Sequence, residues 1–148
     1  MSKPKPTDGK QLYLDLYKGH ASMRKHYQTK ETAKHWLEET LAHLEQVQLE
    51  MKELSDATKA IEGHQFYVDV YRREVRMGLL SMSVRWRLVS GHRHTTWRTL
   101  GPQVRMLPRA IREWYVEANR LTCLLNLQEK SLRFTMKSAS KALTLLGD

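Results

Sequence analysis

The chain has 148 residues, of which 41% are apolar and 28% charged, and its formal net charge is +9. That length suits one domain with its own core, and the single cysteine, Cys123, excludes both an intramolecular disulfide and a four-cysteine zinc site. No apolar run approaches the roughly 20 residues of a membrane span, and the first ten residues lack the apolar core of a signal peptide. We therefore expect a cytoplasmic protein with no membrane partner.

The N-terminal region divides into a tail and a short helix. Residues 1–9 are rich in lysine and proline, which predicts a disordered basic tail. Leu12 and Leu16 then share one side of a helix expected over residues 10–27. We expect residues 10–148 to form a single α+β domain.

A longer helix is expected over residues 30–62. Thr29 or Thr32 can cap its start, and Gly63 supplies a stop at its end. Leucine, valine and methionine recur between these points at helical spacing. A single apolar stripe on a helix this long needs a partner helix.

The apolar period changes to two after Gln65. The alternation predicts strands over residues 65–76, 79–89 and 94–100, with turns at Gly78 and at Ser90-Gly91. These strands would form a three-stranded antiparallel meander. A final helix over residues 108–146 follows, with Pro108 at its first position.

The expected fold class is thus α+β. Two long helices form an antiparallel hairpin, and the small meander is inserted between them in the sequence.

Assumed loop lengths give a register for the meander. A four-residue second loop places Trp86 opposite Trp97 and Arg85 opposite Arg98, and a three-residue first loop sets Val70 beside Trp86. One face of the sheet then carries Val68, Val70, Val84, Trp86, Leu88 and Trp97. The other face carries Tyr71, Arg73, Arg85, Arg87 and Arg98.

Positive charge gathers in the strands and at the start of the last helix. Residues 31–62 hold three basic and eight acidic side chains, whereas residues 72–112 hold ten arginines, no lysine and one acid, Glu74. Arginine favours bidentate phosphate contacts and stacking on bases. The predicted nucleic-acid-binding residues are Tyr71, Arg73, Arg85, Arg87, Arg93, His94, Arg98, Arg105, Arg109 and Arg112.

Simpler interpretations of these residues stay open. The arginines can extend into solvent or pair with acids such as Glu38 and Glu39, and Trp86 suits the core better than a base-stacking platform. His92 and His94 have no third ligand at a suitable spacing, so no metal is expected. No glycine-rich phosphate loop, HExxH run or serine elbow occurs, so neither catalysis nor a cofactor is expected.

Two stretches carry a resemblance. SVRWR at Ser83–Arg87 and the helix Pro108–Arg133, with Arg120-Leu121 and Leu125–Gln128, are similar to small proteins of integrative and conjugative elements, some labelled integrase regulator R. The match covers residues 66–142, and auxiliary mobilisation proteins of conjugative plasmids have a similar plan. The resemblance implies an accessory protein in DNA transfer, integration or maintenance.

Two functions follow as expectations. The first is a non-enzymatic accessory protein of a mobile genetic element that binds nucleic acid, DNA rather than RNA, through the arginine-rich face. The alternative is a module that binds or inhibits an acidic protein such as a relaxase, an integrase or a host defence complex. A homodimer is also expected, because two long helices leave apolar surface that a small sheet does not cover.

Overall fold

The computed structural model of the chain describes residues 25–74 and 80–147. The expected tail at residues 1–9, most of the expected helix at residues 10–27 and the expected turn at Gly78 lie outside these ranges. The chain divides into two compact units, one made of residues 1–39 and 136–148 and the other of residues 40–135.

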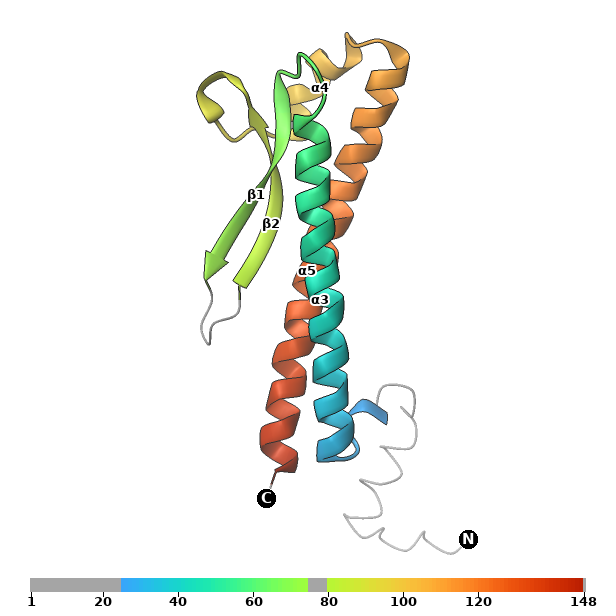
Figure 1. Cartoon of the computed structure of the whole chain (residues 1–148), viewed down its shortest axis with the longest axis vertical. Coiled ribbons are helices and arrows are strands. Elements are labelled where there is room, and N and C mark those ends of the chain that lie inside the picture. Colours follow the sequence, from blue (N-terminus) through green and yellow to red (C-terminus); the bar gives the residue numbers. More distant parts are fainter. Residues whose placement is uncertain (1–24, 75–79, 148) are drawn as a thin grey trace, which may run out of the picture. The chain divides into compact units, whose positions relative to one another are not determined.

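The described residues form an α+β fold with three α-helices and one two-stranded antiparallel sheet (Figure 1). A 3-10 turn η1 (Lys25–Tyr27) comes first. The elements that follow are α3 (Lys30–Lys59), β1 (Phe66–Glu74), β2 (Leu80–Leu88), the 3-10 turn η3 (Ser90–His92), α4 (Trp97–Arg105) and α5 (Arg109–Leu146).

The first unit contains the start of α3 and the end of α5. Thr29 and Thr32 close the start of α3 reciprocally: Thr32 N–H donates to Thr29 Oγ1 at 3.1 Å, and Thr29 N–H donates to Thr32 Oγ1 at 3.0 Å. These bonds satisfy backbone groups that a helix start leaves free. Ala33 of α3 and Ala139 of α5 are buried in this unit.

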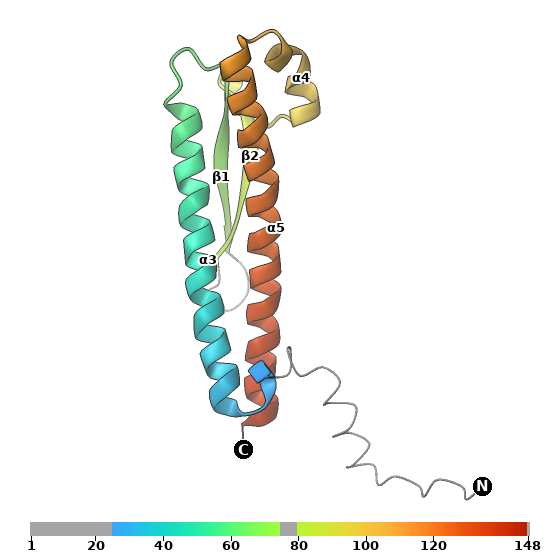
Figure 2. The ribbon, with the colours of Figure 1, turned by 90° about the vertical axis from the view of Figure 1, so that its right-hand side faces the viewer.

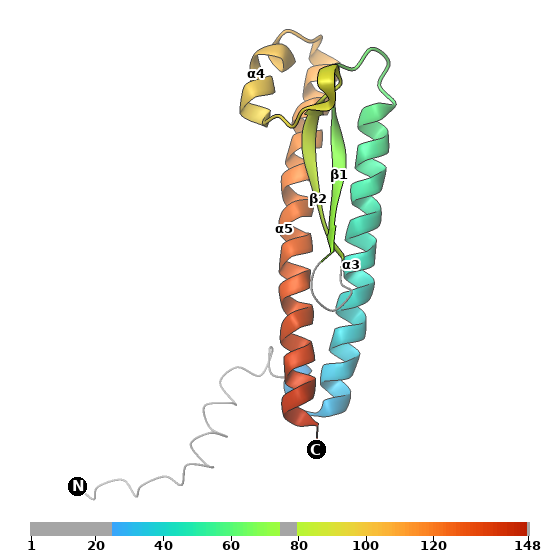
Figure 3. The same ribbon diagram turned by 90° about the vertical axis from the view of Figure 1, so that its left-hand side faces the viewer.

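In the second unit, α3 and α5 run antiparallel and the β-hairpin covers one side of the pair (Figures 2 and 3). β1 lies toward α3 and β2 lies toward α5. Hydrogen bonds agree with this placement, because Thr58 of α3 accepts from Val68 N–H of β1 at 2.9 Å and Asn126 of α5 binds Val84 of β2. The hairpin is thus held by both helices.

The register of the hairpin differs from the expected one by two residues. Val68 lies opposite Trp86, and Val70 lies opposite Val84 rather than beside Trp86. β1 ends at Glu74 and β2 begins at Leu80, and the residues that connect them lie outside the described ranges. Because side chains alternate with period two, a shift of two residues keeps every side chain on its expected face.

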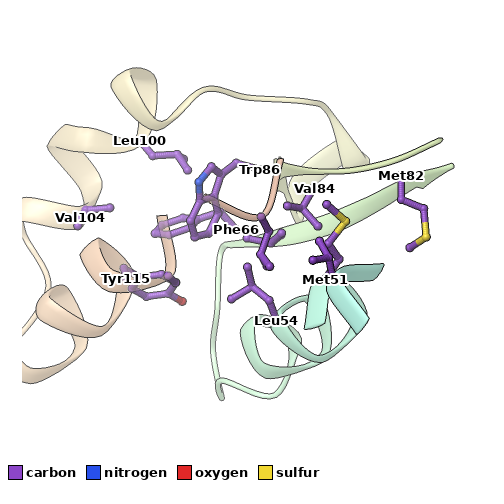
Figure 4. Packing of buried hydrophobic residues seen from close by; sticks show 13 residues of the cluster. Met51, Leu54, Phe66, Met82, Val84, Trp86, Leu100, Val104 and Tyr115 are labelled. Atoms are coloured by element: carbon purple, nitrogen blue, oxygen red, sulfur yellow. The ribbon is translucent and has the colours of Figure 1, made fainter. Parts of the chain in front are cut away.

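Side chains from all these elements meet in one core (Figure 4). Trp86 and Val84 of β2 are buried against Met51 of α3 and Leu100 of α4. Tyr115 of α5 lies 4.7 Å from the ring of Phe66, centroid to centroid, and burial raises the pKa of its phenol above the usual value. The aromatic rings therefore pack the hairpin onto the helices.

The expected third strand over residues 94–100 is wrong. Only an isolated bridge joins Arg87 and His94, and the helix α4 begins at Trp97. Thr96 caps this helix, since its Oγ1 accepts from Thr99 N–H at 3.2 Å.

The expected pairing of Arg85 with Arg98 is also wrong, because it required the third strand and Arg98 lies in α4. The rings of Trp86 and Trp97 still meet, at 5.4 Å between centroids, but the contact joins a strand to a helix. The burial of Leu100 and Val104, four residues apart, is the helical signal that the alternation of Thr95, Trp97 and Thr99 concealed.

Candidate nucleic-acid interface

The outward face of the hairpin is the surface defined by Asp69, Tyr71, Arg73, Ser81, Ser83, Arg85 and Arg87. These residues alternate with the buried Val68, Val84 and Trp86, so the pleat directs them away from the helices. In the view of Figure 3 this face is turned toward the viewer. The predicted residues Tyr71, Arg73, Arg85 and Arg87 are therefore brought onto one surface.

Arg85 stacks on Tyr71 at the middle of this surface. Its guanidinium carbon lies 4.6 Å from the centre of the tyrosine ring, and both residues are exposed. Stacking holds the guanidinium in place without using its five N–H donors. Among the described residues no carboxylate makes an ion pair with Arg85, although Asp69 lies directly opposite in the register. The pair can therefore offer its donors to an external anion.

Asp69 instead forms an ion pair with Arg87. The Nε atom of Arg87 lies 3.1 Å from Asp69 Oδ2, and Lys59 Nζ lies 3.7 Å from Asp69 Oδ1. The buried Nε–H makes no hydrogen bond, so its approach to Asp69 is an ion pair without hydrogen-bond geometry. The side chain of Arg87 is only 25% exposed. Arg87 is thus much less available to a ligand than Arg85.

The remaining donors of Arg87 hold the turn that follows β2. Its Nη1 donates to the carbonyl oxygen of His92 at 3.2 Å, and its Nη2 lies 3.0 Å from His94 Nε2. Because arginine only donates, His94 Nε2 is the acceptor of this bond. The hydroxyl of Tyr67 also meets His92 Nδ1 at 3.2 Å.

The backbone of this turn places Arg93 and His94 in defined positions. Gly91 and His92 both have positive φ, at 73° and 50°, which turns the chain sharply. Leu88 N–H then donates to Arg93 O at 2.9 Å and Thr95 N–H donates to Trp86 O at 3.0 Å. Arg93 and His94 are exposed beside the outward face.

The predicted arginines beyond the turn lie on other elements. Arg98 and Arg105 are exposed on α4, which lies beside the η3 end of the hairpin (Figure 3). Arg109 pairs with Glu113 at 2.9 Å and Arg112 is half-buried, both in the first turns of α5. Those turns lie behind the hairpin in the view of Figure 3. The structure thus gathers the predicted residues of the hairpin and the turn but separates them from Arg109 and Arg112.

Several residues that hold this surface were not predicted. Asn126 brackets one peptide of β2, since its Oδ1 accepts from Val84 N–H at 2.8 Å and its Nδ2 donates to Val84 O at 2.9 Å. One helix heptad earlier, Asn119 Oδ1 accepts from Trp86 Nε1 at 3.0 Å. The seven-residue spacing of two asparagines on one helix face is the signal that identifies them. Asp69 and Lys59 had no comparable signal.

No family model matches the chain. Comparisons with curated proteins and with solved structures also find no match.

The described ranges, 25–74 and 80–147, offer little to other classes of site. No group of three or more histidine, cysteine or acidic side chains there is arranged to hold a metal ion. None of the helices in these ranges combines the length and the apolar character that crossing a membrane requires. The outward face is the arrangement that best fits a charged ligand.

Proposed function

We propose that the chain is a non-enzymatic nucleic-acid-binding protein whose outward hairpin face contacts phosphates. The observation that carries the proposal is Arg85 stacked on Tyr71, with no acid of residues 25–74 or 80–147 paired to it, on a face that also presents Arg73. A fixed guanidinium without a counter-charge favours an anionic ligand. Arg93 and His94 extend the same surface at the turn.

Arg87 is proposed to support this surface rather than to contact the ligand. Its guanidinium joins Asp69 to the turn at His92 and His94. This turn also positions Arg93, which lies between the two histidines. Replacing Arg87 would therefore disturb the surface indirectly, and Arg85 is the better residue for a test of binding.

The proposal includes DNA as the favoured ligand and a role as an accessory protein of a mobile genetic element. This part rests on the resemblance of SVRWR and of the Pro108–Arg133 helix. In the structure Trp86 of the first stretch bonds to Asn119 of the second, and Asn126 binds β2. The resemblance therefore concerns the residues that attach the hairpin to α5, which supports a shared fold more directly than a shared ligand.

Salt-titrated binding tests the proposal. Fluorescently labelled single-stranded DNA, duplex DNA and RNA of one sequence are titrated with the protein at several salt concentrations. The logarithm of the association constant should fall linearly with the logarithm of salt. Arg85→Gln should reduce that slope by about 1, because one phosphate contact is lost.

Lys141→Gln is the matched control, since Lys141 is an exposed cation on α5 in the other compact unit, whereas the hairpin belongs to residues 40–135. It removes the same charge and should leave the slope unchanged. Equal effects of the two variants would mean that only net charge matters, and absence of binding to all three nucleic acids at low salt would reject the proposal. The acidic-protein alternative would then be the one to pursue.

A further inference from the structure

A groove of about 730 Å³ runs between α3 and α5 on the side away from the hairpin. This side faces the viewer in Figure 2, where the hairpin lies behind the helices. Three large apolar side chains of α5 line the groove and stay exposed: Trp114 at 38%, Leu121 at 42% and Leu124 at 44%. A cluster of this kind on a charged surface is typical of an interface.

The lining residues have the spacing that receives another helix. On α3 they are Glu50, Glu53, Leu54 and Ala57, and on α5 they include Trp114, Glu117, Ala118 and Leu121. Both sets follow the pattern i, i+3, i+4, i+7, which is the four-residue hole of knobs-into-holes packing. One groove with a hole on each wall suits two incoming helices, as in a four-helix bundle.

The charges on the two walls differ. Glu50 and Glu53 lie on the α3 wall, and Arg120 lies on the α5 wall, 3.7 Å from Glu117 of its own helix and largely exposed. A two-fold axis parallel to the helices would lay each α3 over the α5 of a second copy, with Arg120 facing Glu50 and Glu53. A perpendicular axis would lay α3 over α3 and oppose like charges. Glu117 also lines the α5 wall, so that wall has one acid and one cation whereas the α3 wall has two acids. The first arrangement is favoured because it does not lay the two acidic α3 walls on each other.

Size is also complementary in that arrangement. Because α3 and α5 are antiparallel, Ala57 and Trp114 lie at the same end of the groove. The small Ala57 of one copy would then lie under the large Trp114 of the other. Alternating large and small residues across an interface fills space without overpacking.

We propose that a second copy of this chain occupies the groove and forms a symmetric dimer through a four-helix bundle. This inference is independent of the proposed nucleic-acid binding. The two hairpins then lie on opposite outer sides of the bundle, so a dimer presents two outward faces. If those faces bind nucleic acid, the dimer is bivalent.

Sedimentation equilibrium of the full chain tests the dimer. The wild type should reach twice the 17.4 kDa of one chain as concentration rises. Leu121→Lys should raise the dissociation constant by about thirtyfold or more, the effect of a hot-spot residue. Leu127→Lys is the control, because Leu127 is 62% exposed on α5 and does not line the groove.

A charge swap keeps the test informative even if Leu121→Lys fails to fold. Arg120→Glu alone should weaken the dimer, and adding Glu53→Arg should restore it. A wild-type mass of one chain at every concentration would overturn the proposal. Equal weakening by Leu121→Lys and Leu127→Lys, or no restoration by the swap, would overturn this groove as the interface.

Discussion

The two faces of the β-hairpin differ in where their polar groups find partners. On the inner face, Trp86 and the Val84 peptide find hydrogen-bond partners in Asn119 and Asn126 of α5. On the outward face, Arg85 lies on Tyr71, and no acid in the described part of the chain pairs with its donors. A polar group satisfied within the chain stabilises the fold, whereas one left unsatisfied at the surface is available for recognition.

The largest expected effect comes from the inner face. Trp86→Ala removes a side chain that is 4% exposed and contacts Trp97, Tyr115 and Phe66. It should lower the free energy of unfolding by about 3–5 kcal/mol, measured by urea denaturation. Tyr71→Ala on the outward face is the comparison, and a loss of similar size there would contradict the division between the faces.

Asn126→Ala should have an intermediate effect. It leaves the N–H and C=O of Val84 without their partners, and the two together should cost about 2 kcal/mol, because an unsatisfied group costs about 1–3 kcal/mol when buried and these bonds are only partly buried. Hydrogen exchange at Val84 should accelerate because its amide is no longer bonded. Gln128→Ala, at an exposed position of the same helix, should change neither stability nor exchange. Unchanged exchange at Val84 in the Asn126 variant would mean that the bracket is dispensable.

The smallest expected effects on stability come from two arginines of the outward face, Arg87 and Arg85, and they should differ from each other. Arg87→Gln should cost about 1 kcal/mol, because the solvent-exposed bond to His92 and the ion pair with Asp69 are lost. Arg85→Gln should stay within about 0.5 kcal/mol of the wild type, as for most exposed positions. Thermal denaturation of both variants checks this difference. Equal losses would show that Arg85 is also structural.

The division between the faces could be predicted from the sequence. Alternation of Val84, Arg85 and Trp86 assigned each residue to its face, and an error of two residues in the register did not alter that assignment. The third strand failed because alternation over a few residues does not separate a short strand from a capped helix. Thr96 begins α4 through a local hydrogen bond, and that bond competes with strand pairing.

The distinction between Arg85 and Arg87 could not be predicted. Both arginines occupy outward positions and are two residues apart. Only Arg87 is held by internal bonds, and these depend on the path of the chain after β2. The positive φ of Gly91 and His92 brings His94 back to Arg87, while Arg85 lies beyond the reach of the turn. Loop geometry of this kind is poorly determined by local sequence, whereas the arginine composition of the whole face is visible in it.

The bracket that Asn126 places on Val84 also concerns how the chain is made. Val84 leaves the ribosome 42 residues before Asn126, so the β2 edge is synthesised before its partner exists. During that interval the peptide groups of β2 are open to strands of other nascent chains. The amide of Asn126 occupies the same donor and acceptor that a neighbouring strand would use. Arrival of α5 therefore ends the period in which the hairpin is prone to mispairing.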